Sequence, residues 1–123
     1  MKIALVTNDG RTISAHFGRA RAYVVVTVED GKVVAREQRE RPDPANQEQT
    51  GEAATTAGGG HHGQAIAPIQ DCDVVLSRGM GAGMHLTLQR AHIRPIMTDI
   101  VNIDEALKTF MEGRLVNKPD LVH

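Results

Sequence analysis

The chain has 123 residues, of which 41% are hydrophobic, 24% charged and 2% aromatic, and its formal net charge is -1. This length suits a single domain over residues 1–123. The near balance of 14 basic and 15 acidic residues, with one Tyr, two Phe and no Trp, argues against a dedicated nucleic-acid-binding protein.

The cysteine content and the start of the chain bear on its compartment. Cys72 is the single cysteine, so the chain cannot form an intramolecular disulfide. The apolar run after Met1 ends at Val6, which is too short for a signal peptide or a membrane span. We therefore expect a soluble cytoplasmic protein with no membrane partner.

Three strands are predicted in the first half of the chain. Residues 3–7 form a short apolar run that ends in an Asn-Asp-Gly turn signal. Residues 23–29 are rich in β-branched side chains, and residues 32–39 continue as a more polar, alternating segment. Asp30-Gly31 between the last two segments predicts a hairpin with a type I′ turn.

The second half alternates helix and strand patterns after a polar interruption. Residues 40–60 show no apolar periodicity and predict a mobile loop within the domain. The segments that follow predict helices over 64–70, 82–91 and 103–112 and strands over 73–77 and 94–98. The last helix has the clearest signals, with Asn102 as N-cap and Gly113 just beyond its end.

The order β-β-β-α-β-α-β-α predicts a mixed five-stranded sheet flanked by helices, with ribonuclease H-like topology. Four of its strands point the same way, and the loops that leave their carboxyl ends share one edge of the sheet. These loops bring His16, His61 and His62 to that edge, together with the turn over residues 79–83. Cys72 falls at the opposite edge.

Each feature of this edge admits a structural and a functional interpretation. The turn Gly79-Met80-Gly81-Ala82-Gly83 is either a tight strand-to-helix connection or an anion site at a helix N-terminus, which Arg78 would reinforce. His61 and His62 are either solvated loop side chains or two imidazole ligands for a transition metal. His16 either supports a turn or is a further ligand.

Several segments, in their order along the chain, carry a resemblance to a known family. They are Ile3-Ala4 through Asp9-Gly10, Ser14-Ala15-His16-Phe17-Gly18-Arg19-Ala20, Gly60-His61-His62-Gly63, Asp73-Val74-Val75 and Gly79-Met80-Gly81. The chain resembles the dinitrogenase iron–molybdenum cofactor biosynthesis family, which includes nitrogenase cofactor carriers and the molybdenum–copper orange protein. The resemblance implies a ribonuclease H-like fold.

The resemblance also implies that the protein binds a preformed metal–sulfur cluster, of the iron–molybdenum or molybdenum–copper type. It implies that the protein receives this cluster from a donor protein and delivers it to an acceptor protein. The expected metal ligands are then His16, His61 and His62. Positive charge and N–H donors around the cluster sulfides would come from the remaining residues of the edge, Arg19, Arg78, Gly79, Met80 and Gly81.

Two other function classes compete with this hypothesis. A small regulatory or anion-binding module would use the turn over residues 79–83 for a phosphate group. An enzyme would need a nucleophile–base pair or a carboxylate cluster at the shared edge, and Asp9 and Asp99 alone do not supply one. We therefore expect a carrier without catalytic turnover.

Overall fold

A computed structural model describes residues 1–41 and 65–122 of the chain. Most of the loop predicted over residues 40–60 lies outside these ranges, as do His61 and His62. No helix within the described ranges is long and apolar enough to cross a membrane.

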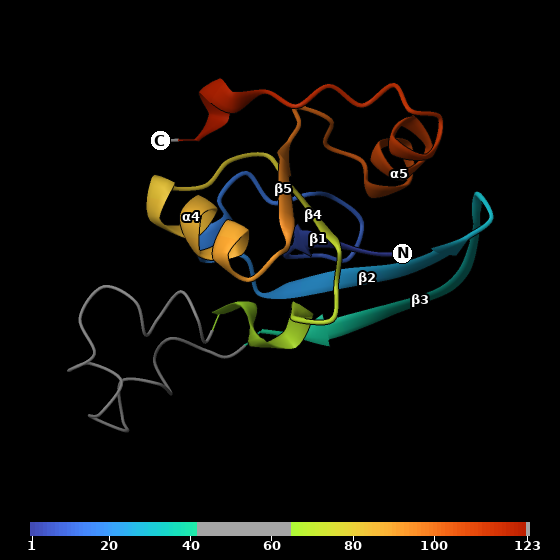
Figure 1. Cartoon of the computed structure of the whole chain (residues 1–123), viewed down its shortest axis with the longest axis horizontal. Helices are drawn as coiled ribbons and strands as arrows, with labels where there is room; N and C mark the ends of the chain where they lie inside the picture. The colour runs from blue at the N-terminus through green and yellow to red at the C-terminus, as the bar shows by residue number, and fades with distance from the viewer. Residues whose placement is uncertain (42–64, 123) are drawn as a thin grey trace.

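Five strands form one mixed sheet in the order β3-β2-β1-β4-β5 (Figure 1). The central strand β1 (Lys2–Thr7) pairs antiparallel with β2 (Ala22–Glu29) and parallel with β4 (Val74–Ser77). The outer strands are β3 (Lys32–Glu40), antiparallel to β2, and β5 (Arg94–Met97), parallel to β4. This topology confirms the predicted ribonuclease H-like α/β architecture.

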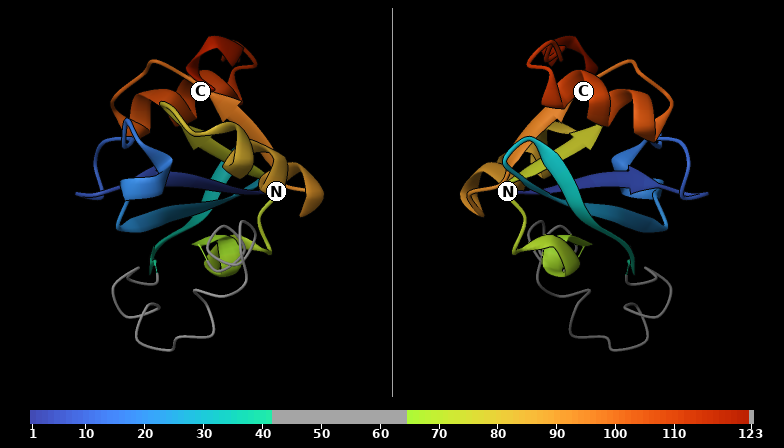
Figure 2. Two further views of the ribbon diagram at one scale, coloured as in Figure 1. Left: turned by 90° about the vertical axis from the view of Figure 1, so that its left-hand side faces the viewer. Right: turned by 90° about the vertical axis from the view of Figure 1, so that its right-hand side faces the viewer.

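The helical elements lie on both sides of the strands. Within the described residues the α-helices are α4 (Ala82–Arg90) and α5 (Ile103–Met111), and the 3-10 helices are η1 (Phe17–Arg19), η2 (Ala67–Ile69) and η3 (Pro119–Leu121). Helix α5 and the C-terminal segment lie on one side of the strands, and η2 lies on the other (Figure 2). Of the helix predicted over 64–70, residues 65–66 are α-helical and residues 67–69 form η2, where Pro68 has no backbone N–H to continue an α-helix.

The core is centred on β1. Its residues Ile3, Ala4, Leu5 and Val6 are fully buried, although successive side chains of a strand point to opposite faces of the sheet. A strand that is apolar on both faces needs cover on both, as parallel strands of α/β proteins have. The apolar run at the start of the chain is therefore the layer onto which both sides of the molecule pack.

Two local signals from the sequence act as predicted. Asp30 and Gly31 both have positive φ, 52° and 74°, as a type I′ hairpin turn requires. The Asn102 side chain accepts a hydrogen bond of 2.9 Å from the backbone N–H of Glu105, which caps α5. Gly113 follows the helix at φ 74°.

A substitution at Asn102 tests how much the N-cap of α5 contributes to the stability of the protein. We expect Asn102→Ala to lower the free energy of unfolding by about 1 kcal/mol, because it leaves an N–H of the first turn without a partner. Urea unfolding followed by circular dichroism measures this change. Asn102→Asp keeps an acceptor at the same place and should retain most of the stability. Equal loss in both variants would contradict the capping role.

Candidate functional site

The segment that carries His16 follows β1 and is held by its own serine. The backbone N–H of Ser14 donates to the carbonyl of Val6 over 2.8 Å. The Ser14 hydroxyl donates to the His16 carbonyl (3.1 Å) and accepts from the His16 N–H (3.3 Å). Phe17 is fully buried in the core, whereas His16 is exposed. The buried ring beside an exposed imidazole fixes where His16 lies at the surface.

This segment is joined to the glycine turn that follows β4. The Phe17 N–H donates to the carbonyl of Gly79 over 3.0 Å, and the Arg78 N–H donates to the carbonyl of Ser14 over 3.4 Å. The Arg78 guanidinium reaches the carbonyl of Ile13 at 3.4 Å. Two segments more than sixty residues apart in sequence thus lie side by side at the carboxyl ends of β1 and β4.

The glycine turn itself is stabilised from two directions. The Ser77 hydroxyl donates to the Gly79 carbonyl (2.9 Å) and accepts from the Gly79 N–H (3.2 Å). The Met80 N–H donates to the carbonyl of Leu121, and Met80 forms a parallel bridge with Val122. The C-terminal segment therefore packs against the turn. Sequence reasoning missed this contact because nothing in residues 114–122 marks them as part of the site.

Met80, which the resemblance places among the residues around the cluster, is buried in the structure. The residue is 2% exposed and belongs to the core, so its thioether does not line the surface of this edge. Its N–H and that of Gly79 already have partners. The donors that remain for an anion lie further on, at Gly81 and the first turn of α4, where no side chain caps the helix. Residues 81–83 are exposed.

A second support of the His16 segment comes from Arg41, at the end of β3. Its guanidinium donates to the carbonyls of Phe17 and Ala20 and lies 5.3 Å from the centroid of the Phe17 ring. Burial lowers the pKa of Arg41. The Phe17 ring in turn packs on Tyr23, with centroids 6.0 Å apart. The sequence did not predict this role of Arg41, because the pairing of β3 with β2 is what places Arg41 next to Phe17.

Two arginines bring positive charge to this edge. Arg19 is exposed, and Arg78 is half-buried beside the glycine turn. Asp9, in the turn after β1, accepts hydrogen bonds from the N–H groups of Arg11 and Thr12, both at 2.8 Å. These bonds lower the pKa of Asp9 to about 2. Asp9 therefore closes a turn as an ionised group and is a poor proton donor or acceptor near neutral pH.

Cys72 lies at the other end of the sheet, as the topology predicted. Asp73, its neighbour, donates from its N–H to the carbonyl of Lys2 at the start of β1. Cys72 is 4% exposed, and burial raises the pKa of its thiol to about 12. Cys72 therefore remains a thiol, remote from His16. Within residues 1–41 and 65–122, no three His, Cys, Asp or Glu side chains gather as a metal site.

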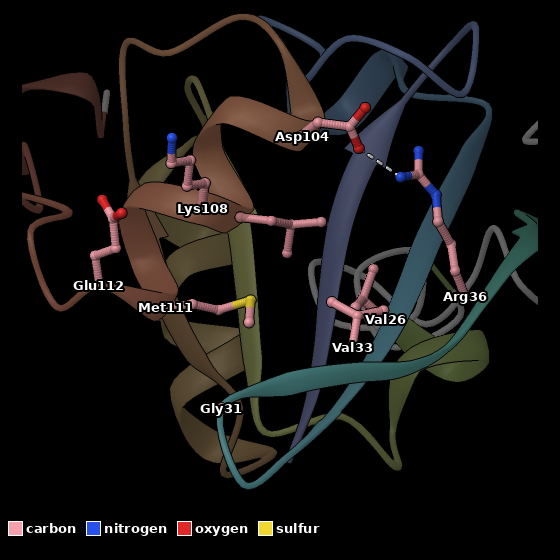
Figure 3. A pocket seen from close by; sticks show the side chains of 9 residues that line it. Val26, Gly31, Val33, Arg36, Asp104, Lys108, Met111 and Glu112 are labelled. Atoms are coloured by element: carbon pink, nitrogen blue, oxygen red, sulfur yellow. Dashed lines mark hydrogen bonds and ion pairs between the residues drawn. The ribbon is translucent and has the colours of Figure 1, made fainter.

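The structure also has a pocket of about 420 Å³ away from this edge, between the β2–β3 hairpin and α5 (Figure 3). Val26, Val33, Leu107 and Met111 form its apolar lining. The Arg36–Asp104 ion pair crosses one side of it, with a distance of 2.6 Å. It holds no imidazole or thiol, so its lining does not offer the ligands expected for a metal cluster.

The turn at Asp9 predicts an acid-sensitive part of the stability. Because the folded pKa lies below the ordinary value of 3.8, the stabilisation is fully present above pH 3.8 and is lost as the pH falls through about 2. We expect Asp9→Asn to flatten the fall of unfolding free energy between these values. Urea unfolding at a series of pH values measures this slope. An unchanged slope in Asp9→Asn would show that other carboxylates cause the fall of the unfolding free energy at low pH.

The Arg41 contacts predict a role in holding the His16 segment. We expect Arg41→Gln to destabilise the protein by about 1–2 kcal/mol, since it removes charge-assisted hydrogen bonds to two carbonyls. Hydrogen exchange at the Ala20 amide, which donates to Phe17, should accelerate. The matched control is Arg21→Gln, because Arg21 is exposed. Equal effects in the two variants would contradict a specific role for Arg41.

The chain is similar to known proteins in sequence and in fold. The sequence matches the family described as "Dinitrogenase iron-molybdenum cofactor" over residues 1–113. The uncharacterized protein MJ0580 of Methanocaldococcus jannaschii is 26% identical over 120 residues, which cover 94% of this chain and 89% of that protein.

Solved structures share the fold. The crystal structure of PH0822 superposes with a TM-score of 0.75 at 23% identity, covering 98% of this chain and 99% of that one. The apo form of the orange protein from Desulfovibrio gigas gives 0.68 at 21% identity, covering 95% and 92%. Since the family match extends over nearly the whole sequence, this chain belongs to the dinitrogenase iron-molybdenum cofactor family.

Proposed function

We propose that this protein binds a preformed metal–sulfur cluster, of the iron–molybdenum or molybdenum–copper type, and delivers it to an acceptor protein in the cytoplasm. The observation that carries the proposal is the hydrogen bond between the Phe17 N–H and the Gly79 carbonyl. It joins the backbone next to His16, an exposed residue, to the turn that leads into α4, whose N-terminus no side chain caps. Family membership and the likeness to the orange protein support the same class of cargo.

The residues at this edge suit an anionic cluster that brings its own sulfides. The imidazole of His16 would bind exposed metal atoms through a ring nitrogen. Arg19, Arg78 and the N–H groups that begin α4 supply positive charge and donors for sulfides. Met80 contributes by packing in the core rather than by its sulfur. His61 and His62 are proposed as further ligands from the sequence alone.

Few points of attachment also suit a carrier rather than an enzyme. A carrier must release its cargo, so a small number of exchangeable ligands is an advantage. The described part of the edge offers no nucleophile paired with a base, and Asp9 is committed to its turn. The reaction that we propose is therefore transfer of an intact cluster without turnover of a substrate.

Anaerobic reconstitution of the apo-protein with iron, molybdate or copper plus sulfide tests this proposal. We expect stoichiometric metal and visible absorption in the wild type, and a several-fold lower content in His16→Asn. The matched control is His92→Asn. His92 is exposed, precedes β5 at the far edge, and has φ 63°, which asparagine tolerates. Circular dichroism checks that each variant remains folded.

The outcomes separate the alternatives. Loss of metal in His16→Asn but not in His92→Asn would support His16 as a ligand of the cluster. Full retention in His16→Ala/His61→Ala/His62→Ala would overturn the ligand assignment. A wild type that retains no metal would remove the main support for a carrier. Stabilisation by phosphate or a nucleotide, unchanged in that triple variant, would instead favour an anion-binding module at the N-terminus of α4.

A further inference from the structure

The strand β3 forms one lateral edge of the sheet. Within the described ranges β3 has only β2 as a strand partner (Figure 1). Nearly all residues of β3 are exposed. An edge strand presents a row of backbone N–H and C=O groups to which a further strand can bond. Whether that happens depends on the side chains that a partner strand would meet.

The second half of β3 reads Arg36-Glu37-Gln38-Arg39-Glu40. We propose that this strand pairs antiparallel with β3 of a second copy of the chain, about a two-fold axis at Gln38. Arg36 then lies opposite Glu40 of the partner subunit, and Glu37 lies opposite Arg39 of the partner subunit. The symmetry repeats both contacts, so four cross-strand ion pairs surround one neutral pair.

The charge pattern selects this register over its neighbours. In a symmetric antiparallel pair, the residue on the axis faces its own copy. Moving the axis by one residue sets Glu37 or Arg39 against itself, and moving it by two sets Arg36 or Glu40 against itself. Like charges directly opposite each other destabilise a strand pair. Gln38 is the one residue of this stretch that can occupy the axis without repulsion.

The backbone of β3 is regular where the pairing needs it. A bulge interrupts its register with β2 near the hairpin, where Thr27 lies opposite Ala35 but Val28 lies opposite Val33. From Ala35 to Glu40 the pairing with β2 is continuous. A bulge twists a strand away from a partner, so the hairpin end is the protected part of this edge and residues 35–40 are the accessible part.

Contacts within the chain leave most of these side chains exposed. Arg36 pairs with Asp104 at 2.6 Å, yet its side chain remains 41% exposed. Glu37 bonds to Arg39 and is 58% exposed. Arg39 is the least accessible, at 22% exposed, because its guanidinium also donates to Asp71 and to the Pro68 carbonyl. Added partners would extend these pairs into charge networks. Exposed ion pairs contribute little individually and are screened by salt, so we expect weak association that falls with ionic strength.

Sedimentation equilibrium over about 10 µM to 1 mM protein at low salt tests the proposal by charge complementation. Glu40→Arg places an arginine opposite Arg36, and Arg36→Glu places a glutamate opposite Glu40. We expect each variant alone to associate about tenfold more weakly than the wild type, because each creates two like-charge pairs. A mixture of the two should recover association, since its cross-strand pairs are again opposite in sign.

Arg94→Glu is the matched control, because Arg94 is exposed on β5, the strand at the other edge. It should associate like the wild type. A wild type that stays monomeric over this range would overturn the proposal. So would variants that self-associate as strongly as the wild type, or a mixture that fails to recover while both variants keep wild-type circular dichroism. These results do not depend on cluster binding.

Discussion

The parallel pairing of β1 with β4 is the constraint on which the rest of this molecule depends. It sets Ile3, Ala4 and Leu5 beside Val74, Val75 and Leu76, so the two strands end at the same edge. The segments that leave them, one with His16 and one with Gly79, can then exchange main-chain hydrogen bonds. A parallel pair requires a long connection. In this chain the connection contains β2, β3 and residues 42–64, which lie outside the described residues.

Much of the fold follows from short-range signals. The β-branched run of β2, the Asp30-Gly31 turn and the Asn102 cap each act within a few residues, so each could be predicted from the sequence. The order of the elements then restricts the topology, because crossover connections have a fixed hand. The weakest prediction was the helix over 64–70, where Pro68 limits hydrogen bonding within the segment.

The site was less accessible to such reasoning. Topology correctly predicted that the turns after β1 and β4 would meet, because strand direction decides it. Burial of Met80 and the stacking of Arg41 on Phe17 depend instead on strand register and side-chain packing. A methionine in a glycine-rich turn is equally compatible with a surface ligand and a core residue. Only the contact of Met80 with the C-terminal segment distinguishes the two.

The anchoring at Arg41 and Ala65 has a consequence for chain length. Arg41 donates to the Phe17 carbonyl, and Ala65 accepts a hydrogen bond of 2.5 Å from the Tyr23 hydroxyl. Since the two rings are in contact, both anchors lie close to one aromatic pair. The entropy cost of closing a chain between fixed points grows only with the logarithm of its length. The number of residues between Arg41 and Ala65 therefore has little effect on the free energy of folding of the sheet.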